Sequence, residues 1–479
     1  MKPILSWLDQ RSMLLAERLV ELAEQLSAFV RRRVVETSIV LGAIVLRFSM
    51  LLTFHPNNGY DAYDHYVYVQ WIATHHSLPD LWLSRATDHP PLFYAIEAAF
   101  FRGLHPPPSL LALPSVMFSS ATMLLIWFGL ERHLPRRRLA RIVGLTLAAI
   151  MPAAVHLSGM VTAEGMNGML AAATLLMGAE ALRRQQRGQR FIWQVLLTGL
   201  LAGLQMLTKI SALVIFASVL GGAAFAVLFG AADRTVRLRQ AATWLLVVVT
   251  FGGTCGWYLV RNQRRYHKPV LSGFDGPDGA SAPKVGPYWK RRPPEFFYGW
   301  SNDVLSHPYA PSGETPRSYF WPVVVASTFV DYYNYGFVRG PEKPSTATGN
   351  WKALRDAAVP FSQASAVGGL VIAVSTVVAW FWALIVCVRR RQAEFIPLLL
   401  APALAVIGQL HFVVAYPFDY QGPIKGVYMQ FGMAPLFGLF GLAVDKMMRR
   451  RATRWIAFIQ CAAVVAVASY TIYARAIAL

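Results

Sequence analysis

The sequence VVETSIVLGAIVLRFSMLLTF, residues 34–54, is followed after a short gap by YDAYDHYVYVQWIATHHSLPD, residues 60–80. The first segment is mostly apolar, and about 20 such residues in a helix suffice to cross the hydrocarbon core of a bilayer. The second segment places carboxylates, histidines and aromatic rings directly after that span. Ionisable groups at membrane depth cost free energy and usually have a task. Together, the two segments predict a membrane protein with a functional site at the end of its first span.

The composition of the whole chain supports a membrane protein. Of its 479 residues, 55% are hydrophobic and 15% are charged, and the mean hydropathy is +0.40, outside the usual range of soluble proteins. The formal net charge of +20 comes from short basic clusters between apolar runs, which is how membrane topology is specified. We therefore expect no nucleic-acid partner, since that needs a basic patch on one face. The cysteines lie in apolar segments without metal-like spacing, so neither a disulfide framework nor a zinc site is predicted.

Apolar runs of membrane-spanning length recur along the chain, and they predict an all-α polytopic membrane protein with about eleven transmembrane helices and two long external loops. The expected spans are residues 34–54, 109–131, 139–158, 162–182, 191–208, 210–230, 241–260, 366–388, 395–414, 427–445 and 454–473. The expected divisions are a cytoplasmic amphipathic interfacial helix over 1–33, a transmembrane catalytic module over 34–260 that includes the first external loop 55–108, a large external loop over 261–365, and C-terminal transmembrane helices over 366–479.

The distribution of Lys and Arg predicts the orientation of these spans. Basic clusters occur at 31–33, 132–141, 183–190, 234–239, 389–391 and 446–454, and the expected spans place all of them on one side. Short basic loops remain in the cytoplasm, so the N-terminus is expected there and both long loops outside. Together with the composition, this favours a bacterial inner (plasma) membrane protein with its active site facing the periplasm. The first span is expected to be an uncleaved anchor, and the short apolar stretch 92–101 to lie at the interface.

Away from the basic clusters, ionisable residues gather at the outer ends of the expected spans. They are Arg47, Asp61, Asp64, His65, Asp88, Glu164, Lys209, Arg261 and Lys425. We expect one external cavity at membrane level to be lined by these groups. For Arg47 the favoured alternative is snorkelling or structural pairing, and for Glu164 it is a favourable charge near a helix N-terminus.

Several short motifs follow one another in a particular order. They are Asp61 with His65 four residues later, LP at 78–79, HPPLFY at 89–94, LTKIS at 207–211, WYLVRNQRRYHKPV at 257–270 and KGVYMQFGMAPL at 425–436. In this combination they resemble the GT-C superfamily of integral-membrane glycosyltransferases, which includes protein O-mannosyltransferases and the bacterial aminoarabinose transferase that modifies lipid A. The resemblance extends from residue 34 to about residue 445.

The resemblance implies transfer of a sugar from a polyprenyl-phosphate donor to an acceptor hydroxyl. It implies catalytic roles for Asp61, Asp64 and His65, and substrate binding by Asp88, His89, Glu164, Lys209, Arg261, Lys425 and Tyr428. Several relatives have adjacent Asp-Glu in the first loop and many an Arg-Tyr pair near the end, whereas this chain has Asp64 as its second acid and Lys425 in place of the Arg. The base therefore stays open between Asp61 and Asp64. No cofactor is certain: Asp61, Asp64 and His65 could hold Mg²⁺ or Mn²⁺, but some relatives work without a metal.

The chemistry of an external site supports the same class of reaction. No nucleotide-sugar pool exists outside the membrane, so a sugar has to arrive on a lipid phosphate. Its transfer needs a carboxylate to accept the proton of the attacking hydroxyl and cations to stabilise the leaving phosphate. The expected partners are a polyprenyl-phosphate sugar donor, an unknown acceptor and membrane lipid. Absence of GxxxxGK[ST] and GxGxxG argues against ATP or dinucleotide use.

Two hypotheses from other classes remain open at this point. A membrane transporter or lipid flippase of envelope biogenesis predicts ionisable residues near the bilayer midplane and two related halves with broken helices. The sequence has no convincing repeat, and its charges lie at one surface. A non-catalytic scaffold for envelope assembly would be favoured if alanine at Asp61 and Asp64 left function intact.

Overall fold

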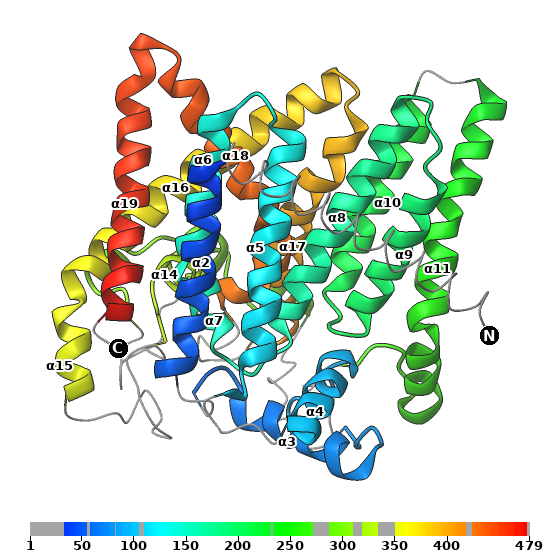
Figure 1. The fold of residues 1–479 in the computed structure, drawn as a ribbon, viewed down its shortest axis with the longest axis horizontal. Helices are drawn as coiled ribbons and strands as arrows, with labels where there is room; N and C mark the ends of the chain where they lie inside the picture. The colour runs from blue at the N-terminus through cyan, green and yellow to red at the C-terminus, as the bar shows by residue number, and fades with distance from the viewer. Residues whose placement is uncertain are drawn as a thin grey trace, which may run out of the picture.

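The computed structural model describes residues 33–54, 58–81, 83–104, 110–230, 233–271, 287–309, 319–333, 350–417 and 424–476. Within these ranges every regular element is a helix (Figure 1). The expected all-α class is therefore confirmed. The amphipathic helix expected over 1–33 falls almost entirely outside the described residues.

A helix is present at the place of each expected span. The helices are α2 (Val34–Thr53), α5 (Leu113–His133), α6 (Arg138–Ile150), α7 (Pro152–Ser158), α8 (Glu164–Gln186), α9 (Ile192–Met206), α10 (Ala212–Phe229), α11 (Arg234–Tyr266), α16 (Val359–Arg389), α17 (Ile396–Ala415), α18 (Gln430–Met448) and α19 (Arg454–Ala476). In the described residues, eight candidate spans are long and apolar enough to cross a membrane, or nine if the bent pair α6–α7 counts as one. The protein is polytopic, but the number eleven is not confirmed.

The difference in number concerns α8 and α9. Helix α8 carries Glu164, Asn167 and Glu180, and it packs against α5, α9, α10 and α18. A helix that is surrounded by protein needs no continuous apolar surface, so hydropathy underestimates its depth in the bundle. Helix α9 is apolar but has only 15 residues, fewer than a full crossing takes.

The bend between α6 and α7 has a local cause. Pro152 is the first residue of α7, and Met151 before it has an extended conformation (φ −56°, ψ 113°). Proline disfavours the helical region for the residue that precedes it and removes a backbone N–H, so the helix breaks there. The two helices meet at an angle of 50°.

Shorter helices fill the two long connections. In the first connection, α3 (Ala62–His75) and α4 (Leu92–Leu104) pack on each other across one end of the bundle (Figure 1). The second contains η3 (Tyr288–Lys290), α12 (Glu295–Tyr298), α13 (Asp303–Ser306), α14 (Phe320–Phe329) and α15 (Asn350–Ala357). The remaining short elements are η5 (Ala393–Phe395), η6 (Gly426–Met429) and η7 (Arg451–Thr453). We call the end of the bundle that carries α3 and α4 the site end.

The arginine-rich turns lie at the opposite end. Figure 1 shows the connections from α5 to α6, from α16 to α17 and from α18 to α19 far from α3 and α4. These connections contain or adjoin the arginine runs 136–138, 389–391 and 449–451. We call this the basic end. The separation of basic turns from the α3–α4 layer agrees with the asymmetry that the sequence predicts.

Candidate active site

Asp61 lies at the start of α3, where it is the residue immediately before the first helical turn. Its backbone is in the left-handed region (φ 55°, ψ 29°), which few residues other than glycine adopt and which aspartate tolerates. The side chain is exposed and does not cap α3. Within the described residues it makes no hydrogen bond or ion pair. The Asp61 carboxylate is therefore available to accept a hydrogen bond or a proton from a substrate.

Asp64 has a different environment, although it is only three residues further on. Its Oδ1 accepts a hydrogen bond from the backbone N–H of Arg85 at 3.0 Å. Its carbonyl oxygen accepts another from Ser84 Oγ at 3.0 Å. Asp64 therefore joins α3 to the turn that leads into α4.

His65 and His89 form a neutral pair near Asp61, in which His65 is buried and the His89 side chain is 27% exposed. The His65 side chain is 4% exposed, its Nδ1 lies 2.7 Å from Tyr94 Oη, and its ring stacks on that of His89 with 5.7 Å between centroids. Burial lowers the pKa of His65 to about 3 and the pKa of His89 to about 4. Both rings are uncharged at neutral pH, so they supply neutral surface and hydrogen bonds at the site.

Lys425 is the cation that three aromatic rings surround. Its Nζ lies 4.1 Å from the ring centroid of Tyr60, 5.1 Å from that of Tyr428 and 5.9 Å from that of Tyr333. It also donates a hydrogen bond to Tyr428 Oη at 3.1 Å. Burial lowers the pKa of Lys425 to about 8, while the nearby Asp61 carboxylate acts to raise it. Aromatic faces stabilise a partly desolvated ammonium group, which keeps a charge at this buried position.

The backbone next to Lys425 is fixed by close packing. The N–H of Gly426 donates to Ser327 Oγ at 2.8 Å. A Cβ atom at position 426 would come within 2.0 Å of Thr328 Oγ1, so only glycine fits there. Helix α14 thereby sets the position of Lys425.

Glu164 and Lys209 provide a second pair of charges. Glu164 is the first residue of α8, Lys209 follows α9, and their side chains form an ion pair. Lys209 Nζ also lies 5.2 Å from the ring centroid of Tyr428. Lys425 Nζ lies 5.1 Å from the same centroid, so the two lysines share this ring. The charge of Glu164 acts to raise the pKa of both Lys425 and His89, and the charge of Lys209 acts to lower the pKa of both.

These contacts bring most of the predicted site residues together. We define the polar cluster as Asp61, His65, His89, Glu164, Lys209, Lys425 and Tyr428. Its members come from α3, the turn before α4, α8, the end of α9 and the segment before α18. The cluster lies at the site end, beside α3.

Asp88 and Arg261 lie beside this cluster. Asp88 Oδ1 is 3.3 Å from His89 Nδ1, and Arg261 donates to Asn262 Oδ1 at 3.1 Å. Burial raises the pKa of the Tyr68 phenol. The charge of Arg261 acts to lower this pKa and that of Asp88 to raise it, so Arg261 and Asp88 both lie near Tyr68. Arg261 lies 5.9 Å from the ring centroid of Tyr266, and in the described part of the chain no aromatic ring is contacted by both Arg261 and Lys425. The lysine that shares a contact with Lys425 is Lys209.

Arg47 is not part of the site. It is 2% exposed and donates to Ser119 Oγ at 3.0 Å and to the carbonyl oxygens of Ala43 and Ala149 at 3.0 and 3.2 Å. The expectation that Arg47 lines the cavity is wrong, and the structural alternative is confirmed. Its hydrogen bonds join α2 to α5 and to the end of α6.

Three site residues were missed by the sequence analysis: Tyr60, Tyr94 and Tyr333. Tyr60 directly precedes Asp61, so its place next to a candidate base could have predicted that its ring belongs to the site. Tyr94 ends the HPPLFY motif and reaches His65. Tyr333 had no signal, because it reaches Lys425 only through tertiary packing, with its hydroxyl donating to the carbonyl of Ile424 at 2.8 Å.

The residues that could have held a metal ion do not form a ligand set. The Asp64 carboxylate is turned toward the Arg85 N–H, and His65 Nδ1 toward Tyr94. Over the described ranges, no group of three or more His, Cys, Asp or Glu side chains is arranged to hold an ion.

Comparison with known proteins relates this geometry to a class of proteins. A model of the dolichyl-phosphate-mannose-protein mannosyltransferase family matches residues 88–255, a segment that includes His89, Glu164 and Lys209. The apo oligosaccharyltransferase of Archaeoglobus fulgidus aligns with 92% of this chain and 56% of its own length, at 13% identity and a TM-score of 0.51. This chain has a GT-C-like fold. The expected resemblance to the GT-C superfamily is confirmed.

Two further solved structures align with the GT-C-like bundle. The same oligosaccharyltransferase tethered to an acceptor peptide covers 94% of this chain and 56% of its own length, at 14% identity and a TM-score of 0.50. ArnT from Cupriavidus metallidurans bound to undecaprenyl phosphate covers 85% of this chain and 77% of its own, at 12% identity and a TM-score of 0.38. The chain thus spans about half the length of the oligosaccharyltransferase that it matches. A comparison with curated protein sequences gave no significant match.

Proposed function

We propose that this protein is a membrane glycosyltransferase that moves a sugar from a polyprenyl-phosphate donor to an acceptor hydroxyl. The observation that carries the proposal is the polar cluster, in which an unengaged carboxylate lies near two lysines at one end of the bundle. A lipid phosphate rests at headgroup depth, where such lysines can reach it. The family model and the GT-C-like fold support the same class of reaction.

In the proposed reaction, Asp61 accepts the proton of the acceptor hydroxyl as its oxygen attacks the anomeric carbon of the sugar. The bond between that carbon and the phosphate oxygen breaks, and its electron pair leaves with the polyprenyl phosphate. Lys425 and Lys209 stabilise the negative charge that develops on the phosphate. Glu164 holds Lys209 in place through their ion pair. Asp64 keeps the turn before α4 attached to α3.

The remaining residues are assigned to the sugar and to the walls of the site. The neutral rings of His65 and His89 provide a stacked surface without adding charge next to the base. Asp88 and Arg261, which flank Tyr68, are the polar groups best placed to bind hydroxyl groups of the donor. Tyr428, whose ring both lysines contact, orients both.

The basic end is proposed to face the cytoplasm of a bacterium and the site end the periplasm, because Lys and Arg are retained in cytoplasmic loops. Single cysteines at Arg187, Val236 and Arg390 should resist an impermeant thiol reagent in intact cells. Cysteines at the exposed residues Tyr63 and Trp300 should react. Labelling of intact cells and of lysed cells, compared by gel shift, measures this. A reversed pattern would place the polar cluster in the cytoplasm and overturn the use of an external lipid-linked donor.

The lowered pKa of Lys425 predicts a pH dependence of donor binding. With a pKa of about 8, this lysine is charged at pH 7 and loses its charge as the pH rises through 8. Donor affinity should therefore fall by up to about ten-fold between pH 7 and pH 9, since the charged fraction of Lys425 falls by that factor and a charged hydrogen bond to phosphate is lost with it. Binding of a polyprenyl-phosphate sugar at pH 7, 8 and 9 measures the effect.

The matched control for this titration is Lys425→Arg, because a guanidinium stays charged throughout this range. Its donor affinity should change little between pH 7 and pH 9. An equal fall in both proteins would assign the pH dependence to another group, and a flat profile in the wild type would refute the role of Lys425.

The proposal as a whole is tested with purified protein and a panel of polyprenyl-phosphate sugars. Mass spectrometry follows the release of polyprenyl phosphate in the presence of candidate acceptors. Release from at least one donor is expected. If no donor is consumed in a protein preparation that binds polyprenyl phosphate, the chain is not a glycosyltransferase of this kind.

A further inference from the structure

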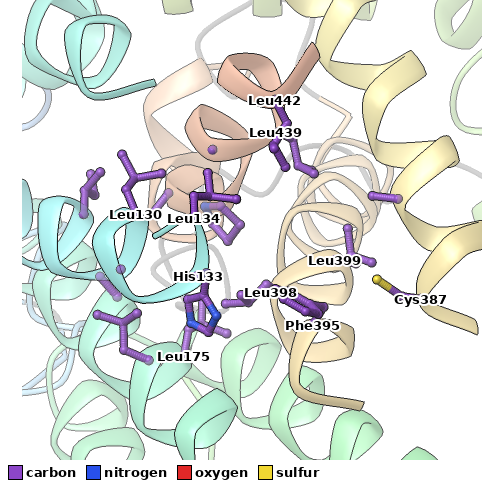
Figure 2. Close-up of a pocket in the computed structure, with 18 of the residues that line it drawn as sticks. Leu130, His133, Leu134, Leu175, Cys387, Phe395, Leu398, Leu399, Leu439 and Leu442 are labelled. Atoms are coloured by element: carbon purple, nitrogen blue, oxygen red, sulfur yellow. The ribbon is translucent and has the colours of Figure 1, made fainter. Parts of the chain in front are cut away.

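An apolar cavity lies between α5, α8, α16, α17 and α18 (Figure 2). Its lining includes His133, Cys387 and Gln392, which adjoin the connections of the basic end, and none of the polar cluster. Its volume is about 250 Å³. Figure 2 shows leucines from four directions around it: Leu130 of α5, Leu175 of α8, Leu398 and Leu399 of α17, and Leu439 of α18. Cys387 of α16 lies beside Leu399 and Phe395.

This cavity suits a hydrocarbon chain better than water. A buried water needs two to four polar partners, and even a cavity of about 150 Å³ stays dry when its walls are apolar. An empty space of this kind loses the dispersion contacts of its lining. Trp382 of the lining is 45% exposed, so the cavity is not sealed from its surroundings. Since α5, α16 and α18 have the length and composition of membrane spans, the hydrocarbon available at this depth is a lipid chain.

The cavity adjoins a charged recess at the basic end. His133 and Phe395 line both spaces, and their rings pack edge to face with 5.5 Å between centroids. The other residues that line the recess are Glu131, Arg132, Pro135, Arg183, Arg187 and Glu394. An apolar cavity next to an arginine-rich recess is complementary to a phospholipid, which has an apolar acyl chain and a charged headgroup.

The charges of the recess leave a cation available. Arg132 is bonded to Glu180 at 3.1 Å, and Arg183 pairs with Glu180 and lies 4.0 Å from Glu394. Glu131 is paired with Arg33 at 2.7 Å and with Arg141 at 3.2 Å. The Arg187 side chain is exposed and, among the described residues, makes no hydrogen bond or ion pair, although its charge acts on Glu394 of the same recess. Basic pockets between transmembrane helices bind anionic lipid headgroups.

We propose that the apolar cavity and the charged recess together bind one anionic phospholipid of the membrane. One acyl chain occupies the cavity between α5, α8, α16, α17 and α18, and the phosphate lies against Arg187 and Arg132. The bound lipid joins helices from the first and last parts of the chain. The site is separate from the proposed donor site, which lies at the other end of the bundle, and it does not depend on the proposed enzymatic activity.

The test uses the full chain in nanodiscs and in mild detergent, with native mass spectrometry of the bound lipid. Phosphatidylglycerol and phosphatidylethanolamine of identical chains are offered at equal concentration. Arg187→Glu reverses the charge of this arginine, and Arg190→Glu is the matched control, because Arg190 is also exposed but does not line the recess. Ala434→Trp fills the cavity from α18 and leaves the recess unchanged.

The expected result is one retained phosphatidylglycerol in the wild type and in Arg190→Glu. Arg187→Glu should reduce that occupancy by about five-fold or more, given the usual contribution of one basic residue near a lipid surface. Ala434→Trp should reduce retention of both lipids while the thermal unfolding temperature shows a folded protein. Equal retention of both lipids by the wild type, or equal losses in Arg187→Glu and Arg190→Glu, would overturn the proposal. Should Ala434→Trp fail to fold, the two arginine variants still decide it.

Discussion

Replacing Asp61 by asparagine should lower turnover by about 10²- to 10⁴-fold, the usual contribution of a positioned base. The side chain keeps its size, and the structure gives it no hydrogen bond or ion pair within the described residues to lose. Membrane expression and donor binding should therefore stay close to those of the wild type. Turnover of a polyprenyl-phosphate sugar by purified Asp61→Asn, measured with its donor affinity, tests this.

Asp64→Asn is the matched control for this prediction, since it makes the same chemical change three residues away. The Asp64 carboxylate accepts the Arg85 N–H, and the amide oxygen of asparagine can accept the same bond. We expect a smaller loss of turnover than in Asp61→Asn. If Asp64→Asn loses turnover while Asp61→Asn retains it, the base is Asp64. If both variants stay active, no carboxylate of this loop acts as the base.

Replacing Lys425 by alanine should weaken donor binding by about ten- to a hundredfold, because a charge-assisted hydrogen bond to the phosphate is lost. The loss should appear in the dissociation constant of the donor. Binding of polyprenyl phosphate without a sugar should weaken equally, since the contact is to the phosphate. Equilibrium binding of both lipids to the purified variant measures this.

Lys352→Ala controls for the loss of a lysine as such, since Lys352 is exposed on α15 at the edge of the bundle (Figure 1). It should bind donor like the wild type. An unchanged affinity in Lys425→Ala would remove this residue from the phosphate site. Lys209, which also contacts the Tyr428 ring, would then be the better candidate.

The helical class could be predicted from sequence because lipid leaves little choice: apolar runs of sufficient length become helices. Boundaries were less accurate. Helix α16 begins at Val359 rather than residue 366, and α11 continues to Tyr266 rather than ending at residue 260. Both extensions are more polar than the cores of their helices, so hydropathy did not include them.

The site was partly predictable. The spacing of four between Asp61 and His65 indicates one face if the segment is helical, and α3 does begin at Ala62, with the His65 N–H bonded to the Asp61 carbonyl at 3.0 Å. The different environments of Asp61 and Asp64 were not predictable, because they depend on the position of Arg85. The rings around Lys425 come from segments far apart in the sequence, and no local pattern encodes such a cluster.

The two hypotheses from other classes differ from the proposed function in what they predict for the donor. A flippase would move a polyprenyl-phosphate sugar across the membrane with its sugar–phosphate bond intact. A scaffold would leave the donor unchanged. The glycosyltransferase breaks that bond and leaves polyprenyl phosphate in the leaflet at the site end.

The most direct test of the central claim therefore follows that bond. Purified protein is placed in liposomes with an isotope-labelled polyprenyl-phosphate sugar and an acceptor that it uses, and both leaflets are analysed by mass spectrometry. We expect one free polyprenyl phosphate for each sugar transferred, and almost none with Asp61→Asn. Intact labelled donor appearing in the opposite leaflet, with no free polyprenyl phosphate formed, would contradict it.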